Sequence, residues 1–466
     1  MPGTFFGVEI ARRGINVHRA AMDVTGHNMA NANTPGYSRQ AAVIQASDPW
    51  TIPNLATSLQ PGQLGTGAQV EQVRRIRDYY LDVQYRQAGS YEGYWQQKLD
   101  FSQRIETVFP EPDGQGIQAG LLDFFNDWQD LNNDPQNSGV KAAVKESGDE
   151  LAATIRQTYS QLVGIGESIT GAINDQVDHA NKLLTEIADV SNAIIFTIKN
   201  GAQPNDLLDQ RDQLLDQLAA LGPINVDVQD NGMITVNFIN STTTVLQDDG
   251  TGKVTASQLA LSTGAGPGGD ENHLSVDGVD VINLTGLADY YTGAPEGAGM
   301  GAILGNESAR LGNKDLLERL DNLAVAIIDN INNKSGLTFF TGAGAADIAL
   351  DSGVKNNCDS IIGENALTVA QLQSTPVTIG TATATFENYY QSMVAQVGAN
   401  VEKADRMLDN QQAISQQIDS LRQSVSGVSL DEELTMVIQI NYGYQASARM
   451  LSMQDEMLDY LINRIV

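Results

Sequence analysis

Apolar residues recur with helical spacing close to the start of the chain. Over residues 4–31, two rows each repeat every seven residues, as expected for the faces of one helix. The first row is Val8, Ile15, Met22 and Met29, and the second row is Ile10, Val17 and Val24. A surface helix of a monomer usually needs one apolar stripe. Two rows therefore predict a helix that meets neighbours on more than one side.

The end of the chain has a similar pattern. Ser429 is a suitable N-cap, and acidic residues occupy the first turn of the helix that follows it. One heptad row consists of Val437, Tyr444, Leu451 and Leu458, and an adjacent row contains Met436, Met450 and Met457. Heptads sustained over about four repeats favour a coiled coil or a bundle. A helix buried inside a monomeric bundle remains the alternative. Two terminal helices with apolar rows are typical of a protein that joins a larger assembly through its ends.

Helical periodicity also dominates the middle of the chain, with one interruption. Helical spacing recurs in five segments: 74–94, 141–198, 207–218, 306–331 and 386–425. Between Pro223 and Asn306 the period changes to two. Turns at Asp230-Asn231-Gly232 and Asp277-Gly278 then predict two β-hairpins. We therefore expect a mainly α fold with an inserted β domain, and further short strands in the Gly- and Thr-rich segment 336–385.

Composition narrows the possible partners. The chain has 466 residues and a net charge of −30, which disfavours nucleic acid and anionic membrane surfaces as partners. The acid is unevenly spread, because residues 1–86 hold eight arginines, no lysine and six acidic residues. No apolar run is long enough to insert into a membrane, and the N-terminus does not have the pattern of a cleaved signal peptide. Cys358 is the single cysteine, so no internal disulfide is expected.

The sequence offers little support for catalysis. The four histidines, His18, His27, His179 and His273, are scattered and form no metal-ligand spacing such as H-E-x-x-H. Cys358 lies in a segment without a recognisable catalytic context. We therefore expect no catalytic residues, no cofactor and no metal site.

Motifs near both ends resemble a known family. The segment ANANTPGYSR at residues 30–39 resembles the N-terminal signature of the bacterial flagellar rod, hook and hook-associated proteins. The segment YQASAR at 444–449 resembles the closing helix of the same axial proteins. Two internal segments, RRIRDYYLD at 74–82 and PNDLLDQRD at 204–212, are similar to the hook-associated protein 1 family, which forms the hook–filament junction.

This resemblance implies an architecture. The N- and C-terminal helices would pair as a coiled coil, with residues 1–50 and 427–466 as two halves of an inner tube domain. Residues 51–225 and 305–426 would form a discontinuous helical bundle, and 226–304 would form an outer β domain.

The resemblance also implies a location and partners. The chain would be exported through the flagellar type III apparatus without a cleaved signal peptide, and would work outside the cell in the flagellum. Its expected partners are copies of itself, hook protein, hook-associated protein 3, and an export chaperone that holds the C-terminal helix. An unassembled apolar row invites aggregation, which is a physical reason for such a chaperone.

The residues expected at the assembly interface come from the helix rows and the signature motifs. They are Val8, Ile15, Met22, Asn28, Asn31, Asn33, Pro35, Gly36, Tyr37, Val437, Tyr444, Gln445, Ala448, Leu451 and Leu458.

Three alternatives remain at this stage. The chain could be another axial protein, namely hook protein, a distal rod protein or hook-associated protein 3. It could be a flagellar scaffold that carries an enzymatic insert within 226–304. A secreted helical adhesin or translocator is the third, although it would leave the N-terminal signature unexplained.

Overall fold

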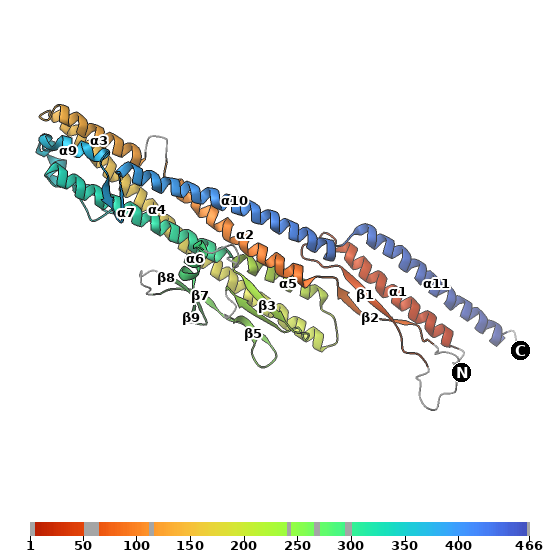
Figure 1. Ribbon diagram of the computed structural model, residues 1–466. Helices are drawn as coiled ribbons and strands as arrows, with labels where there is room; N and C mark the ends of the chain where they lie inside the picture. Colours follow the sequence, from red (N-terminus) through yellow and green to blue (C-terminus); the bar gives the residue numbers. More distant parts are fainter. Residues whose placement is uncertain are drawn as a thin grey trace.

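The computed structural model describes residues 5–50, 65–110, 116–239, 244–264, 271–293 and 301–463. The molecule is an elongated rod in which the long helices run roughly along its axis (Figure 1). Both chain ends lie at one extremity, where α1 (Phe6–Ala30) pairs with α11 (Leu430–Asn463). The predicted pairing of the terminal helices is therefore confirmed. We call this extremity the tube end and the opposite extremity the distal end.

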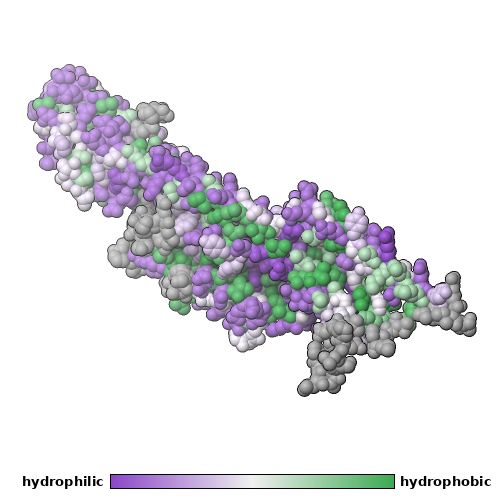
Figure 2. Space-filling model, turned by 45° about the vertical axis from the view of Figure 1, so that its right-hand side comes forward, coloured by the Kyte–Doolittle hydropathy of each residue, from purple (hydrophilic) through white to green (hydrophobic). Residues whose placement is uncertain are grey.

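The bundle is made of helices from both halves of the chain, as predicted. Its long members are α2 (Tyr79–Glu106), α3 (Ile117–Asn133), α4 (Ser138–Lys199), α5 (Asn205–Leu221), α7 (Gly301–Ser335) and α10 (Phe386–Ser426). Shorter helices are α6 (Leu284–Gly293), α8 (Ser352–Asn356) and α9 (Ala366–Ala370). On the face shown in Figure 2, the distal end is mainly hydrophilic, whereas hydrophobic residues gather toward the middle and the tube end.

The described strands form small antiparallel sheets. A hairpin of β1 (Gln40–Ala46) and β2 (Ala68–Arg75) lies beside α1. The insert has a four-stranded sheet of β3 (Ile224–Val228), β4 (Ile234–Phe238), β5 (Thr244–Asp248) and β6 (Val254–Ala256). Its three-stranded sheet is β7 (Leu259–Gly264), β8 (Glu271–Val276) and β9 (Val279–Asn283). Two-stranded ribbons pair β10 (Phe340–Thr341) with β11 (Ala349–Leu350), and β12 (Val377–Ile379) with β13 (Ala382–Ala384).

Both predicted hairpins of the insert are confirmed, since β3 pairs with β4 and β8 pairs with β9. One predicted boundary was wrong. Helical spacing suggested a helix from Arg74, but Arg74 and Arg75 pair with Ala41 and Gln40 in the β1–β2 hairpin. The helix begins only at Tyr79, because the Asp78 side chain accepts a hydrogen bond from the backbone N–H of Tyr80 and caps it.

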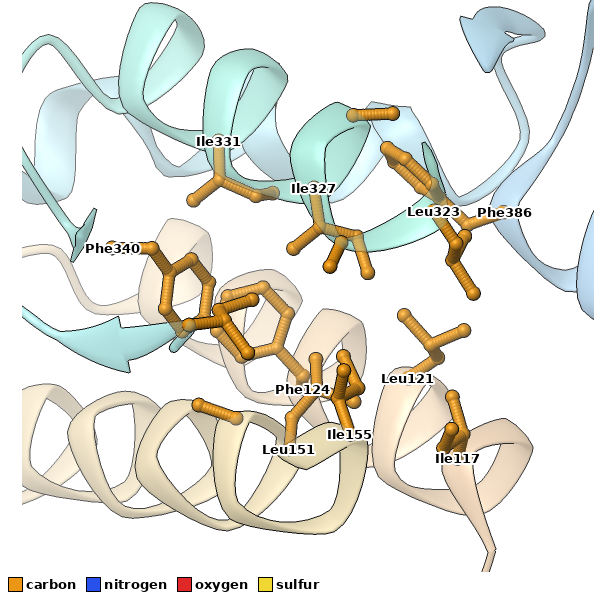
Figure 3. Packing of buried hydrophobic residues seen from close by; sticks show 14 of the residues in the cluster. Ile117, Leu121, Phe124, Leu151, Ile155, Leu323, Ile327, Ile331, Phe340 and Phe386 are labelled. Atoms are coloured by element: carbon orange, nitrogen blue, oxygen red, sulfur yellow. The ribbon is translucent and has the colours of Figure 1, made fainter. Parts of the chain in front are cut away.

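Two hydrophobic cores divide the rod. The distal core joins α3, the N-terminal half of α4, the C-terminal half of α7 and the start of α10. Figure 3 shows Phe124 and Leu121 of α3, Leu151 and Ile155 of α4 and Ile327 of α7 pointing toward one another in it. The proximal core joins α2, α5, the C-terminal half of α4 and the sheets of the insert. Burying aromatic and branched residues in this way supplies most of the favourable free energy of folding.

The β insert is part of the proximal core rather than a detached module. Val236 and Phe238 of β4 and Leu246 of β5 are fully buried in the same cluster as Ile187 of α4. The chain enters and leaves the insert at one point, because a Cβ on Gly301 would lie 2.4 Å from the Cα of Gly222. The family resemblance implied an outer β domain at 226–304, yet the inner faces of its strands carry buried residues that pack in one core with α4.

Candidate functional site

Small residues make the contact between α1 and α11. A Cβ on Gly14 would lie 2.7 Å from Ser447 Oγ, and one on Gly443 would lie 2.4 Å from the His18 ring. Ala11 and Ala21 are buried on the same side of α1. With Gly7, Gly14, His18, Thr25 and Asn28 they form a series spaced alternately four and three residues apart, which is the spacing of a coiled-coil core. The two backbones can therefore approach closely.

The larger apolar side chains are only partly covered in the helix pair. Val8, Ile15 and Met22 on α1, and Val437, Leu451 and Leu458 on α11, are all half-buried. Tyr444 is 39% exposed. The outer side of α11 also exposes several apolar side chains: Leu434, Ile438, Tyr442, Met450, Met453 and Met457. Gln445 is exposed and Ala448 is half-buried, on the same helix. Continuous apolar surface on this scale typically marks an interaction site.

The signature motif forms the joint between the helix pair and the rod. Asn28 is 1% exposed, and its Nδ2 donates to the carbonyl of Gln40 at 2.9 Å and to Glu433 Oε2 at 3.2 Å. Its Oδ1 accepts from the Tyr37 hydroxyl at 2.8 Å and from the Gln40 N–H at 2.9 Å. Asn28 thus uses both donors and its acceptor, as a buried amide must to avoid a desolvation cost. Burial raises the pKa of the Tyr37 hydroxyl.

Glu433 is fully buried in this joint, at the start of α11. Arg39 Nε donates to Glu433 Oε1 at 2.7 Å, and Arg39 Nη1 donates to Glu432 at 2.9 Å. The backbone N–H of Arg39 also donates to the carbonyl of Ser426, the last residue of α10. The N-terminal signature therefore contacts both helices that flank the α10–α11 bend.

The turn between α1 and β1 faces solvent. Asn31 is half-buried at the end of α1, and Asn33 and Pro35 are exposed. Gly36 has a φ of +79°, a conformation that favours glycine. With the α10–α11 bend at Ser424–Ser429, this turn lines a polar cavity of about 500 Å³.

A cluster of ion pairs anchors the joint to the bundle. It consists of Arg75, Arg77, Arg86 and Arg422 with Asp82, Asp209, Asp212 and Asp216. These residues come from β2, α2, α5 and α10, so the cluster gathers the N-terminal, middle and C-terminal parts of the chain. Asp209 also accepts from the N–H of Ser38, at 2.9 Å, and from its hydroxyl, at 2.7 Å.

The cluster shifts the pKa values of Asp212 and Arg77. Burial alone would raise the pKa of Asp212, but Arg77, Arg75 and Arg86 outweigh that effect and hold the pKa below its ordinary value. Burial opposes the charge of Arg77 too, yet Asp212 and Asp82 raise the pKa of its guanidinium. Asp212 and Arg77 are therefore both charged at neutral pH.

The sequence drew attention to the signature residues, whose role at an assembly interface stays a prediction, but did not reveal their partners within the chain. Asp209, Asp212 and Asp216 are spaced three and four residues apart, which places them on one face of α5 and was a usable signal. The small-residue heptad of α1 was a second such signal. Glu433 gave none, because an acidic residue in a first helical turn is ordinary.

Within the described part of the chain, no group of three or more His, Cys, Asp or Glu residues is arranged to hold a metal ion. Over the same residues, no helix is both long enough and apolar enough to span a bilayer.

Comparisons with known proteins agree with this geometry. The family model "Flagellar hook-associated protein FlgK helical domain" matches residues 102–346. A basal body rod protein model matches 9–37, and the C-terminal model of the basal body rod FlgEFG proteins matches 420–464.

Similar proteins span nearly the whole chain. Flagellar hook-associated protein 1 of Bacillus subtilis is 29% identical over 99% of both chains. That of Escherichia coli is 24% identical over 97% of this chain and 98% of its own. The flagellar hook junction protein FlgK from Burkholderia pseudomallei has a similar fold, with a TM-score of 0.61 and 13% identity. The match covers 75% of this chain and all of that structure.

Proposed function

Because this chain belongs to the family of the flagellar hook-associated protein FlgK, we propose that it assembles at the distal end of the hook and joins the hook to the filament. It is a structural component of the bacterial flagellum. The observation that carries the proposal is the tube end. There, α1 and α11 pair through small residues, and the outer side of α11 exposes apolar side chains. Such a surface suits contact with identical neighbours in a ring or helix.

The interface of this assembly lies on the two terminal helices and the signature turn. The half-buried residues Val8, Ile15, Met22, Val437, Leu451 and Leu458, with Tyr444, Gln445 and Ala448, would contact neighbouring copies. Asn28, Asn31 and Tyr37 set the direction of the helix pair, and Asn33, Pro35 and Gly36 form the exposed turn beside it.

The partners follow from that position. They are further copies of the chain, hook protein below and hook-associated protein 3 above. Before assembly, an export chaperone covers the apolar surface of α11. The protein leaves the cell through the flagellar export apparatus, and its working location is extracellular. In domain terms, 1–50 and 427–466 form the inner domain, 51–225 and 305–426 form the bundle, and 226–304 form the insert.

Electron microscopy of cells that lack the protein tests this function. Hooks without filaments, together with monomeric filament protein in the medium, are the expected result. Missing hooks would instead favour a rod or hook protein, and attached filaments would refute a junction role.

A substitution tests the interface itself. Met453→Asp places a carboxylate on the outer side of α11, where Met453 is 62% exposed and burial against a neighbour would cost several kcal/mol or require a proton. We expect loss of filament attachment with an unchanged melting temperature of the monomer. The matched control is Leu367→Asp on α9 at the distal end, where Leu367 is 44% exposed. Swimming cells with normal filaments would refute the assignment of this side of α11 to the interface.

A further inference from the structure

Four long helices link the two cores: α2, in which Phe101 is proximal and Ile105 is distal, and α4, α7 and α10. In α4 the last distal residue is Leu162 and the first fully buried proximal residue is Ile169. The corresponding pairs are Leu316 and Ala309 in α7, and Val397 and Ala404 in α10. The two cores are therefore joined by a short belt, which we define as residues 162–169, 309–316 and 397–404.

Each of α4, α7 and α10 has a glycine inside this belt. A Cβ on Gly164, Gly312 or Gly398 would meet nothing within 4 Å. Close packing in the chain therefore does not require glycine at any of the three positions. Glycine in a helix interior weakens the helix, because its backbone gains more conformational entropy than that of other residues when the helix unfolds. Three such positions at one level of the rod weaken α4, α7 and α10, three of the four long helices that cross it.

Packing is also thin around the belt. A groove of about 390 Å³ lies between α2 and α4, where it is lined by Phe101, Gly164 and Ile165 among others. A second groove of about 380 Å³ lies between α2, α7 and α10, where Gly312 and Val397 contribute to its wall. Missing contacts of this kind lower the energy needed to shift neighbouring helices.

A polar contact replaces apolar packing between α4 and α7 at this level. Asn313 is 2% exposed, and its Nδ2 donates to the carbonyl of Leu162 at 2.9 Å. Its Oδ1 has no protein partner among the described residues. A Cβ on Gly166 would lie 3.0 Å from Asn313 Nδ2, so Gly166 makes room for this contact. A hydrogen bond between a side chain and a backbone carbonyl can persist when one helix rotates slightly against the other, whereas interlocked side chains resist such a rotation.

We propose that the belt is a hinge, at which the distal half of the rod bends relative to the proximal half and the tube end. This hinge goes beyond the proposed junction role and does not depend on it, because the bending takes place within one molecule. In an assembly that fixes the tube end, such a hinge would let the outer half of each copy tilt separately.

Pulsed electron–electron resonance between two spin labels tests the hinge in the full-length monomer. One label replaces exposed Glu318 on α7 in the distal half, and the other replaces exposed Val279 on β9 in the proximal half, with Cys358→Ser as background. We expect a broad distance distribution for this pair. A reference pair, Glu186 and Val279, lies within the proximal half and should give a narrow one.

The triple variant Gly164→Ala, Gly312→Ala and Gly398→Ala should narrow the first distribution toward the width of the reference pair. It should also slow amide exchange in the belt by roughly five-fold per helix. The matched control is Gly89→Ala with Gly171→Ala, at two helical glycines whose Cβ positions are equally free but lie within the proximal half.

The control variant should stabilise its own helices and leave the first distribution broad. A native distribution as narrow as the reference, or a triple variant that stays broad, would overturn the hinge. Narrowing in the control variant as well would overturn its location at the belt. Loss of junction function in cells would bear on neither result.

Discussion

Replacing Asp212 with asparagine removes one charge from the centre of the ion cluster and keeps its shape. Asp212 lies 2.8 Å from Arg75, 3.3 Å from Arg77 and 3.2 Å from Arg86. The asparagine amide would turn an N–H group toward at least one guanidinium. Removing one partner of a buried ion pair costs about 3–5 kcal/mol, because the remaining charges are left uncompensated.

The lower end of that range applies here. The three arginines keep Asp209, Asp82 and Asp216 as other partners, so we expect a loss of about 3 kcal/mol in the free energy of unfolding at pH 7. For a cooperative unit of roughly 200 residues, this corresponds to a fall of about 10 °C in the melting temperature.

The stability lost on replacing Asp212 should shrink as the pH falls. The folded-state pKa of Asp212 is lowered, so its stabilisation is present above the unfolded value of about 3.9 and is lost as the pH falls through the folded value. The melting temperatures of the native chain and of Asp212→Asn should therefore differ at pH 7 and converge in strong acid.

The assay is thermal unfolding by circular dichroism at several pH values, with hydrogen exchange of α5 to locate the change. The control is Asp405→Asn on α10, where Asp405 is exposed and forms no ion pair with another described residue. A variant that melts within about 2 °C of the native chain at pH 7, or a difference that persists in acid, would refute the reasoning.

Three further outcomes can be measured. Gly443→Leu should separate α1 from α11, because even a Cβ would lie 2.4 Å from the His18 ring; faster exchange in α1 is expected, and unchanged exchange would contradict the close contact. Asn28→Ala should lower the free energy of unfolding in urea by about 2–3 kcal/mol, since it leaves buried groups of Gln40 and Glu433 without partners; a loss below about 1 kcal/mol would show that water replaces the amide. Deleting 226–304 with a short linker should expose apolar residues of α4 and cause aggregation, whereas a well-folded product would show that the bundle does not need the sheets.

Local periodicity predicted the elements well and their contacts less well. The long polar helix expected over 141–198 is α4, and the turns at Asn231-Gly232 and Asp277-Gly278 are hairpins. These features depend on residues close together in sequence. The heptad pattern on α1 was read from its large apolar residues, whereas the contact with α11 is made by Gly14 and its small neighbours.

The ion cluster could be predicted only in part. The acidic face of α5 is visible in the sequence, and so are the alternating arginines Arg75 and Arg77. Nothing local shows that the two segments meet, because the pairing of Arg75 with Asp209 spans 134 positions. Long-range pairing of this kind follows from how the helices pack, and the packing of several amphipathic helices has no unique solution from periodicity alone.

The joint at Asn28 has a consequence for the order in which the protein is made. Asn28 bonds to Glu433 across 405 positions, and a ribosome working at 5–20 residues per second needs roughly 20–80 s to cover that distance. During this interval the signature motif has no Glu433 and the ion cluster has no Arg422. A chain truncated before the end of α10 can never supply them. The joint therefore closes only on a nearly complete chain, and its closure distinguishes finished molecules from interrupted ones.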